Sequence, residues 1–543
     1  MKAAELFIKC LENEGVEYIF GIPGEENLAL MDALLDSSIR FVTTRHEQGA
    51  AFMADVYGRV TWRAGVCMST LGPGATNLIT GVADANMDHA PLVAISGQAD
   101  TNRLHKESHQ VLDLQHIFAP VTKYSSRVLT PNVIPEVIRK AFKLAQTEKT
   151  GASFIEFPEN LAAMEIDSAP LRAQQPTMPE PAHDRVVAAA QLISEARYPI
   201  ILAGNGVIRA KAWQQLADFA TKLNIPVANT FMAKGVIPFK HPMALGSVGL
   251  QAHDYVNTGF DKADVILCVG YDLVEYHPRL WHPTCDRKII HIDTAPAEVD
   301  TSYVVEVGVM GDIRHSLAQI AELATPQQGH KLRPLRNALI EDMNRHQDDM
   351  AFPLKPQKII WDLRTAMHLE DIVICDVGAH KLWMARMFRC EHPNTCIISN
   401  GFASMGIAVP GAIATRLAYP QRRVVAVTGD AGFMMNSQEI ETAIRLNIPL
   451  VILIWNDGAY GLIEWKQMVT YGRVSHVRFG NPDFVKYAES FGARGYRVNH
   501  ASELMPILKE ALNNDKVNII DCPVDYTENI KLTAKLGEAI FQL

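Results

Sequence analysis

Short runs of valine, isoleucine and leucine recur along the whole chain and alternate with stretches of helical periodicity. Clear runs cover residues 200–203, 265–269, 424–428 and 450–455. Continuous apolar runs of this length are typical of strands that are buried on both faces, and strands that alternate with helices favour parallel sheets. We therefore predict an α/β fold in which mostly parallel central sheets are flanked by helices.

The length of the chain and two polar segments indicate how this pattern is divided. At 543 residues the chain is too long for a single hydrophobic core. Residues 169–183 contain four prolines, which are too many for a helix or a central strand. Residues 325–333 form a second polar segment, which leads into a predicted helix. We predict three domains, which cover residues 1–168, 184–325 and 355–543.

The composition argues against several kinds of partner. The net charge is −9 and no block of lysines and arginines occurs, so nucleic acid is not expected as a partner. No apolar run approaches the ~20 residues that span a bilayer, so we expect no membrane partner. The first residues lack the pattern of a signal peptide. The eight cysteines are scattered without a C-x-x-C motif, which is typical of reduced thiols, and we expect a cytoplasmic protein.

A glycine-containing loop with one carboxylate follows a predicted strand in the last third of the chain. Gly429-Asp430-Ala431-Gly432 comes directly after the apolar run at residues 424–428. Ligands of α/β sheets bind at the carboxyl ends of the strands, which is where this order places Asp430. Glycines let backbone N–H groups approach an anion closely. The loop therefore predicts a site for an anionic ligand.

The next predicted strand also ends in a polar group. Asn456 follows the run at residues 450–455, and Asp457 and Gly458 come directly after it. If the two strands are parallel neighbours, Asp430 and Asn456 lie side by side. Oxygen atoms of aspartate and asparagine suit Mg²⁺, which also binds diphosphate oxygens. We predict a Mg²⁺ site whose protein ligands are Asp430, Asn456 and the backbone carbonyl of Gly458.

One carboxylate near the start of the chain has two interpretations. Glu47 stands in the sequence Arg45-His46-Glu47, between a predicted strand at residues 40–43 and a predicted helix at residues 48–58. A carboxylate at the start of a helix is stabilised by the helix dipole, and this structural role is the simpler interpretation of Glu47 alone. The predicted Mg²⁺ site favours a functional role, because the two signals together are typical of one kind of enzyme.

This combination resembles the thiamin diphosphate enzymes, a family that includes acetohydroxyacid synthases, pyruvate oxidases and 2-keto-acid decarboxylases. The 24 residues between Ala431 and Asn456 match the spacing of the family's cofactor fingerprint. Ala431 stands where the family usually has glycine and Asp457 where many members have asparagine, but neither change removes a predicted ligand. Three further segments are similar to the family's pyrimidine-binding domain: Phe20 to Gly24, Arg45 to Glu47 and Leu71 to Asn77.

The resemblance implies roles for several residues. Glu47 would lie beside N1′ of the cofactor's aminopyrimidine and favour the tautomer whose 4′-nitrogen removes the C2 proton. Met405 would bend the cofactor, although a methionine that fills a gap in the core is the simpler interpretation of this residue alone. Gln110 would lie near the reacting carbon as a second catalytic residue. Besides Glu47, the expected cofactor-binding residues are Pro23, Gly72, Asn77, Gly378, Ala379, His380, Gly401, Ser404, Met405, Gly429, Asp430, Ala431, Gly432, Asn456, Gly458, Ala459 and Tyr460.

Within the family, the chain is most similar to acetolactate synthases of the catabolic, FAD-independent type. Biosynthetic members hold FAD with a Gly-x-Arg-Phe-Asp-Asp-Arg-like stretch, at the place where this chain has Gly270 to Pro278. Gly204-Asn205-Gly206 is a weak dinucleotide signature because no third glycine follows at the required spacing. We therefore expect thiamin diphosphate and Mg²⁺ as cofactors, and no FAD.

The resemblance also implies a substrate and an assembly. The enzyme would decarboxylate one pyruvate and join the remaining two-carbon unit to a second pyruvate, which gives 2-acetolactate and CO₂. Related decarboxylases usually carry two adjacent histidines in the region where His105 and His109 are separated here. In the family, the cofactor lies between the first domain of one subunit and the third domain of its partner. A homodimer would thus be the smallest active unit, and a homotetramer is expected.

Three alternatives stay open from the sequence. The chain could be another thiamin diphosphate enzyme, such as an FAD-containing acetohydroxyacid synthase, a pyruvate oxidase or a decarboxylase of a different keto acid. It could bind the cofactor without turnover, although the complete set of Glu47, Asp430 and Asn456 argues against that role. It could also be a nicotinamide-dependent dehydrogenase built on the central domain.

Overall fold

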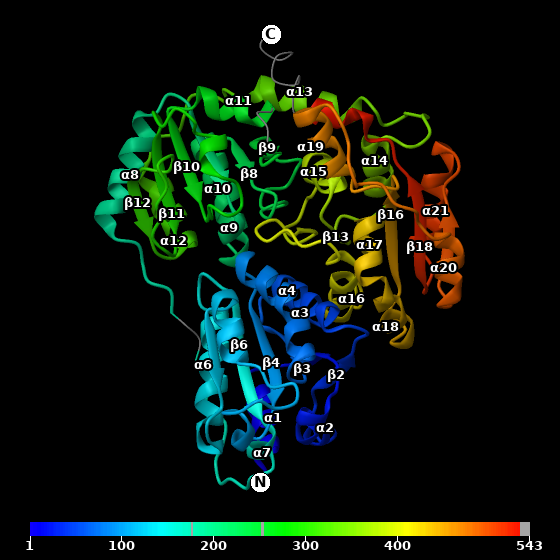
Figure 1. Ribbon diagram of the computed structural model, residues 1–543. Coiled ribbons are helices and arrows are strands. Elements are labelled where there is room, and N and C mark those ends of the chain that lie inside the picture. The colour runs from blue at the N-terminus through cyan, green and yellow to red at the C-terminus, as the bar shows by residue number, and fades with distance from the viewer. Residues whose placement is uncertain (175–176, 251–254, 533–543) are drawn as a thin grey trace.

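The computed structural model describes residues 1–174, 177–250 and 255–532. It contains three domains, each built on a six-stranded sheet with helices on its faces (Figure 1). The strand pairings within these sheets are parallel. The predicted α/β class is therefore confirmed. The N-terminal domain lies at one end of the molecule, and the other two domains lie side by side at the opposite end.

The N-terminal domain has the strand order β2-β1-β3-β4-β6-β5. The predicted helix that follows Glu47 is α3, which begins at Glu47 itself. The strands are β1 (Tyr18–Gly21), β2 (Arg40–Thr43), β3 (Gly65–Ser69), β4 (Leu92–Gln98), β5 (Tyr124–Arg127) and β6 (Ala152–Pro158). The α-helices are α1 (Ala3–Asn13), α2 (Leu28–Leu34), α3 (Glu47–Thr61), α4 (Pro73–Met87), α5 (Leu114–Phe118), α6 (Ile134–Gln146) and α7 (Glu159–Ala162).

The central domain has the strand order β12-β11-β10-β7-β8-β9. This is the order of doubly wound sheets that bind dinucleotides. The strands are β7 (Pro199–Ala203), β8 (Val227–Asn229), β9 (Ala244–Ser247), β10 (Val265–Val269), β11 (Lys288–Asp293) and β12 (Val305–Met310). The α-helices are α8 (His183–Glu195), α9 (Asn205–Arg209), α10 (Trp213–Leu223), α11 (Tyr255–Lys262) and α12 (Ile313–Leu323).

The C-terminal domain has the strand order β14-β13-β15-β16-β18-β17, which repeats the order of the N-terminal domain when each is counted from its first strand. The strands are β13 (Ile372–Cys375), β14 (Cys396–Ile398), β15 (Val424–Gly429), β16 (Leu450–Asn456), β17 (Arg494–Arg497) and β18 (Val517–Pro523). The α-helices are α14 (Pro356–Ala366), α15 (Ala379–Met387), α16 (Ala408–Ala418), α17 (Asp430–Asn436), α18 (Ile440–Arg445), α19 (Gly461–Tyr471), α20 (Phe484–Ser490) and α21 (Leu504–Leu512).

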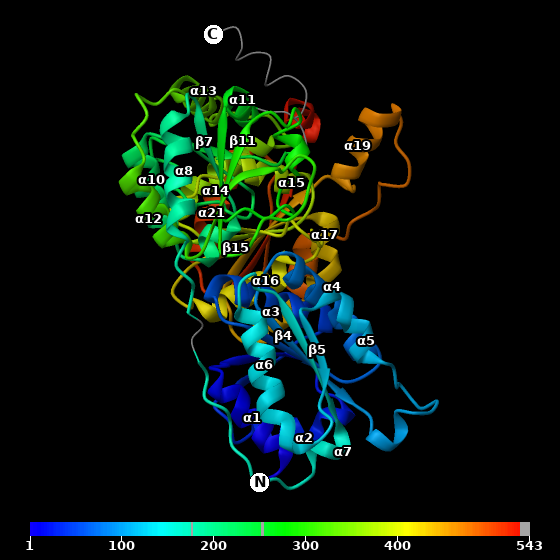
Figure 2. The same cartoon turned by 90° about the vertical axis from the view of Figure 1, so that its left-hand side faces the viewer.

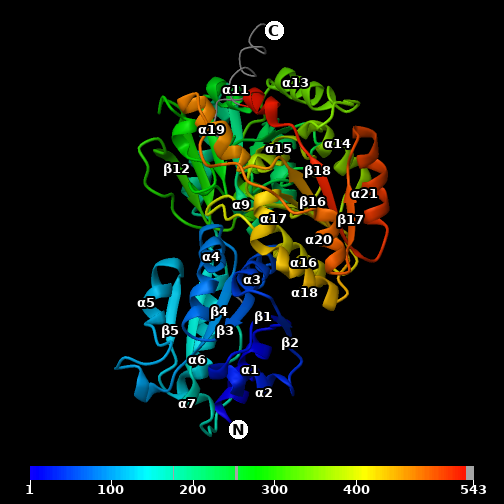
Figure 3. The ribbon, with the colours of Figure 1, turned by 45° about the vertical axis from the view of Figure 1, so that its right-hand side comes forward.

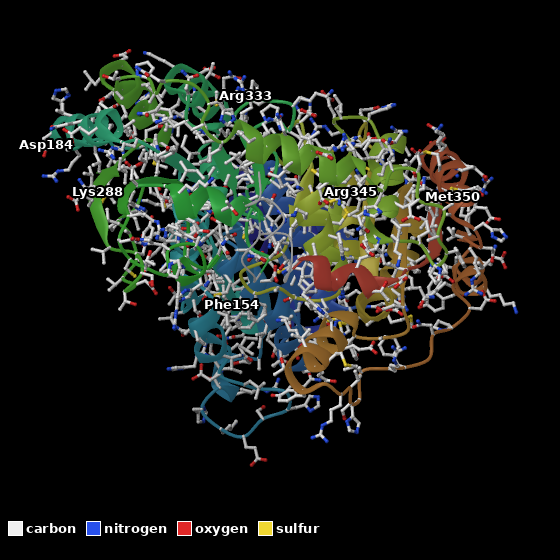
Figure 4. The ribbon with its side chains drawn as sticks, turned by 90° about the horizontal axis from the view of Figure 1, so that it is seen from above. Phe154, Asp184, Lys288, Arg333, Arg345 and Met350 are labelled. Atoms are coloured by element: carbon white, nitrogen blue, oxygen red, sulfur yellow. The ribbon has the colours of Figure 1, made fainter. Side chains whose placement is uncertain are left out.

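Helix α13 (Arg333–Asn344) connects the central and C-terminal domains. The labelled residues Arg333, Arg345 and Met350 follow this connection across the molecule in Figure 4. Leu335 belongs to a hydrophobic cluster of the central domain, whereas Met343 belongs to one in the C-terminal domain. The helix therefore contributes to the cores of both domains that it connects.

Helix α3 packs against α16, so the N-terminal and C-terminal domains share one hydrophobic core. Phe52 and Met53 of α3 belong to the same buried cluster as Ile413 of α16. A Cβ atom on Gly411 would lie 2.7 Å from Cγ2 of Val56, so a glycine at this position lets the two helices approach closely. Figure 3 shows α3 and α4 at the end of the N-terminal domain that faces α16 and α17.

Helix α19 projects from the body of the molecule (Figure 2). None of its residues is buried, and its exposed apolar side chains are Ile463, Met468, Val469 and Tyr471. Within the described ranges, no helix combines the length and the apolar character that crossing a membrane requires.

Candidate active site

A pocket opens at the carboxyl ends of the strands of the C-terminal sheet. Its cavity volume is about 120 Å³. The pocket brings together ten of the predicted cofactor residues: Gly378, Ala379, His380, Met405, Gly429, Asp430, Ala431, Gly432, Ala459 and Tyr460. The other lining residues are Val377, Asp457, Gly461, Leu462, Ile463 and Tyr526.

Asp430 and Asn456 lie side by side, as the predicted order of their strands requires. Asp430 is the first residue of α17, and Asn456 is the last residue of the adjacent strand β16. The side-chain nitrogen of Asn481 donates to Asp430 Oδ2 at 2.7 Å and to Asn456 Oδ1 at 3.1 Å. Because one atom contacts both oxygens, these oxygens converge on a single point, as the ligands of a cation must.

Asn481 and Asp457 belong to this site, although sequence reasoning gave neither a role. Burial, followed by the negative charge of Asp430, raises the pKa of Asp457 to about 7. Burial also raises the pKa of Asp430. Two neighbouring carboxyls that resist ionisation favour a bound cation. Asp457 could have been found from its position directly after Asn456, a predicted metal ligand. Asn481 lies in a loop after α19 and belongs to no motif.

Gly458 is held between the pocket and the loop after α19. Its φ of 66° lies in the left-handed region that favours glycine. Its N–H donates to Asp430 Oδ2 at 2.8 Å, and its carbonyl accepts from the N–H of Phe479 at 3.2 Å. A carbonyl oxygen has two lone pairs, so this bond leaves one lone pair for the predicted metal contact.

A buried carboxylate shapes the loop that carries Met405. Asp376, which follows β13, accepts hydrogen bonds from the backbone N–H groups of Gly406 at 2.8 Å and Ala408 at 3.3 Å. Burial raises the pKa of Asp376 to about 6, and its hydrogen bonds oppose this shift. The loop fixed in this way places Met405 in the lining of the pocket.

Gly401 and Ser404 do not line the pocket. Their backbone N–H groups donate to two carboxylates of the N-terminal domain, Gly401 to Asp88 at 2.5 Å and Ser404 to Asp84 at 3.2 Å. Arg59 pairs with both of these carboxylates, at 2.9 Å from Asp84 and 2.7 Å from Asp88. Gly401 and Ser404 therefore hold the loop before Met405 against the N-terminal domain. Their contact with a cofactor stays a prediction.

Glu47 belongs to a separate group of predicted residues in the N-terminal domain. It is the first residue of α3 and is buried. The side-chain nitrogen of Asn77, on α4, donates to Glu47 Oε2 at 3.0 Å. A Cβ atom on Gly72, just before α4, would lie 2.8 Å from the carbonyl oxygen of Gln110. The predicted residues Glu47, Gly72, Asn77 and Gln110 therefore gather around the start of α4.

The side chains of this second group differ in exposure. Gln110, with a φ of 58°, and Asn77 are exposed, whereas Glu47 is buried. Pro23 is exposed in the loop after β1, and the next residue, Gly24, lies against Thr70. None of the described residues that line the pocket at Asp430 comes from the N-terminal domain. The predicted site residues thus form two groups, one in each of the domains that meet at α3 and α16.

Comparison with protein families gives a match in each domain. Residues 1–117 match the N-terminal TPP binding domain of thiamine pyrophosphate enzymes, residues 186–320 match the central domain, and residues 376–522 match the C-terminal TPP binding domain. Thiamine pyrophosphate is another name for thiamin diphosphate. The chain is a thiamin diphosphate enzyme. The predicted family is confirmed, while the predicted domain boundaries stay predictions.

This thiamin diphosphate enzyme is similar over nearly its whole length to several acetolactate synthases. It is 38% identical to the acetolactate synthase of Bacillus subtilis (strain 168), over 98% of this chain and 95% of the relative. It is 35% identical to the catabolic acetolactate synthase of Raoultella terrigena, over 98% of this chain and 97% of the relative. It is 33% identical to the large subunit of acetolactate synthase isozyme 3 of Escherichia coli (strain K12), over 98% of this chain and 96% of the relative.

The pocket residues of this thiamin diphosphate enzyme fit the diphosphate group. His380 is buried, and its Nε2 has no hydrogen-bond partner among residues 1–174, 177–250 and 255–532. Burial lowers the pKa of His380 to about 3, so the ring is neutral. A Cβ atom on Gly429 would lie 3.5 Å from this ring, so the backbone and the imidazole line the pocket together. A buried polar atom in the lining and the convergent oxygens of Asp430 and Asn456 suit a diphosphate with its cation.

The strand order of the central domain suits a dinucleotide, but the side chain of Glu275 is bonded to the glycine turn at residues 204–206. The N–H of Asn205, at the start of α9, donates to both carboxylate oxygens of Glu275, at 2.9 and 3.1 Å. Burial, followed by the charge of Asp272, raises the pKa of Glu275 to about 8. Asp272 itself pairs with Arg209 at 3.0 Å and with Lys149 at 2.7 Å. A cluster of acidic and basic side chains, which are buried except for the partly exposed Lys149, therefore lies at the carboxyl end of this sheet.

Proposed function

We propose that this thiamin diphosphate enzyme is an acetolactate synthase, which converts two pyruvate molecules into 2-acetolactate and CO₂. The observation that carries the proposal is the convergence of Asp430 Oδ2 and Asn456 Oδ1 beside the pocket of a chain whose full-length relatives are named acetolactate synthases. The convergent oxygens support binding of the cofactor with Mg²⁺, and the names of the relatives support the reaction.

The side chains of the two groups would have distinct tasks. When bound, thiamin diphosphate supplies an electron sink that stabilises the charge left behind as CO₂ departs. Asp430, Asn456 and the carbonyl of Gly458 would bind Mg²⁺. Glu47, fixed by Asn77, would exchange a proton with N1′ of the aminopyrimidine. Gln110 would donate a hydrogen bond from its exposed amide to pyruvate and so orient it.

We further propose that the enzyme works without FAD. The support is the glycine turn at residues 204–206, whose backbone N–H at Asn205 is already bonded to Glu275. A dinucleotide at this turn would have to displace the buried carboxyl group of Glu275, which would leave the N–H of Asn205 and the hydroxyl of Thr230 without this partner. Retention of Glu275 in this position keeps the crevice closed to a diphosphate.

We also propose that the smallest active unit is a homodimer, which associates further into a homotetramer. Glu47 and the pocket at Asp430 belong to separate groups in this chain, so a second chain can supply Glu47 to the pocket. Exposed apolar side chains on the elements around the pocket support this arrangement, because large apolar patches mark interaction surfaces. They are Phe402, Met434, Met435, Tyr460, Ile463, Met468, Val469 and Tyr471.

Product analysis tests the proposed reaction. The purified protein is incubated with pyruvate, Mg²⁺ and thiamin diphosphate without added FAD, and acetolactate is measured as acetoin after acid treatment. The proposal predicts two pyruvates consumed for each acetolactate formed. Acetaldehyde as the main product would replace it with a decarboxylase, and activity that requires FAD would replace it with a flavin-dependent relative. Turnover of another keto acid but not of pyruvate would also contradict it.

A further inference from the structure

Glu439 is a buried carboxylate of the C-terminal domain that bonds to the backbone of the N-terminal domain. It ends the 3₁₀ turn η6 (Ser437–Glu439), which follows α17, and its exposed fraction is 0%. Its Oε1 accepts hydrogen bonds from the backbone N–H groups of Arg45 at 3.0 Å and His46 at 3.1 Å. The hydroxyl of Thr442 donates to its Oε2 at 2.7 Å. A carboxylate this deep costs free energy unless it is hydrogen-bonded, and these donors compensate the cost.

The two amides that Glu439 binds form the turn that presents Glu47. His46 is the N-cap of α3, and its Nδ1 accepts from the N–H of Gln48 at 3.0 Å. Glu47 follows as the first helical residue. The side-chain bond of Glu47 to Asn77 fixes its carboxylate, but the direction in which the side chain leaves the backbone depends on this turn.

The residues that follow Glu47 also lie against the C-terminal domain. A Cβ atom on Gly49 would lie 2.7 Å from Glu439 Oε1, so the absence of a side chain at this position leaves room for the carboxylate. The side-chain nitrogen of Asn436 donates to Gln48 Oε1 at 3.3 Å and to the carbonyl of Gly406, beside Met405, at 3.0 Å. The end of α17 and the turn η6 after it thus contact the chain both before and after Glu47.

We propose that Glu439 is a positioning residue, which holds the turn of Glu47 so that the Glu47 carboxylate meets the cofactor at the right place and angle. This inference rests on the proposed function, because it takes Glu47 as the group that exchanges a proton with N1′. Glu439 acts only through the backbone of Arg45 and His46. A misplacement of about 1 Å in such a group can slow a reaction by roughly 100-fold.

The first experiment measures amide hydrogen exchange in the cofactor-free protein. Glu439→Gln keeps the shape of the side chain but removes its charge and one acceptor oxygen. The amides of Arg45 and His46 should exchange at least about 10-fold faster, the effect of losing hydrogen bonds to a charged group. The matched control is Glu441→Gln, two residues away, whose carboxylate is partly exposed and pairs with Arg445 at 2.9 Å. In the control, the amides of Arg45 and His46 should exchange at the rate of the parent. Unchanged exchange of these two amides in Glu439→Gln would overturn the proposal.

The second experiment measures C2 proton exchange of thiamin diphosphate bound to the protein with Mg²⁺. Glu439→Gln should slow this exchange about 10- to 100-fold, while its affinity for the cofactor stays within about 3-fold of the parent, because the Mg²⁺ ligands are untouched. The double variant Glu47→Gln/Glu439→Gln should exchange no more slowly than Glu47→Gln alone. Additive slowing in the double variant would mean that Glu439 does not act through Glu47.

Gly49→Ala provides a second variant if Glu439→Gln does not fold. Its new methyl group would displace Glu439 Oε1 while the charge remains, so it should also slow C2 exchange at unchanged cofactor affinity. A parent protein that binds no thiamin diphosphate would contradict the proposed function, and the amide exchange of Arg45 and His46 would still decide whether Glu439 holds the turn. Loss of cofactor affinity in Gly49→Ala with normal C2 exchange of the bound cofactor would overturn the positioning role.

Discussion

At the scale of single residues, the pocket combines a buried polar atom that lacks a partner with carboxyl groups that resist ionisation. His380 Nε2 is buried without a partner in the described part of the chain. Burial raises the pKa values of Asp430 and Asp457. Buried polar atoms are normally satisfied, so His380 Nε2 and the convergent oxygens of Asp430 and Asn456 together indicate a charged ligand in this pocket.

Substitution of the first predicted metal ligand tests this interpretation. Asp430→Asn should weaken the binding of Mg²⁺ with thiamin diphosphate by at least about 100-fold, because it removes the only charged ligand in the predicted set. Without cofactor, the variant should be as heat-stable as the parent, because it loses a carboxyl whose burial is costly. Calorimetric titration and thermal unfolding measure the two effects. Asp36→Asn, an exposed change in the N-terminal domain, is the control, and unchanged affinity in Asp430→Asn would contradict the metal assignment.

Substitution of Glu47 separates binding from activation. Glu47→Gln should keep the affinity for the cofactor within about 3-fold, because Asp430 and Asn456 remain, but slow C2 proton exchange by roughly 10²- to 10⁴-fold. The rate is measured by NMR after acid quench of the enzyme in deuterated water. Exchange at nearly the parent rate would remove Glu47 from its proposed role.

At the scale of elements, the parallel topology explains which site residues could be predicted from the sequence. Asp430 and Asn456 each end an apolar run, and neighbouring parallel strands bring such ends together. Asn481 could not be predicted, because it comes from the loop after α19 and reaches Asp430 through the folding of that loop. The bond from the N–H of Gly401 to Asp88 could not be predicted either, because it is a contact between domains that local patterns do not encode. Glu439 was missed for the same reason.

The glycine turn of the central domain leads to a prediction about pH. The pKa of Glu275 is raised from an ordinary value of 4.5 to about 8 in the folded chain. A carboxyl with a higher pKa in the folded than in the unfolded chain binds its proton more tightly when folded. Its contribution to the free energy of unfolding is therefore present at low pH and is lost as pH rises from about 4.5 to about 8.

Urea unfolding at several pH values between 5 and 8 tests this relation. Glu275→Gln cannot titrate, so its free energy of unfolding should fall less steeply with pH than that of the parent. Glu306→Gln, an exposed change on β12 of the same domain, should keep the slope of the parent. Equal slopes for Glu275→Gln and the parent would mean that Glu275 is already ionised across this range.

At the scale of the whole molecule, the first and last domains have equivalent sheets but complementary functional groups. Both have the same strand order, and they meet through α3 and α16. The N-terminal domain holds Glu47 and Gln110, and the C-terminal domain holds the pocket with Asp430. The three domains and their sheets could be predicted from alternating strands and helices, whereas the separation of the site into two groups depends on how the domains pack.

The most direct test of this account mixes two inactive variants, Glu47→Gln and Asp430→Asn, and measures acetolactate formed from pyruvate. If each active site combines Glu47 of one chain with Asp430 of another, half of the re-formed dimers contain both variants, and each mixed dimer has one intact site. The mixture should then regain about one quarter of the parent activity, although each variant alone stays nearly inactive. Mixed dimers that form but produce no acetolactate would contradict the account.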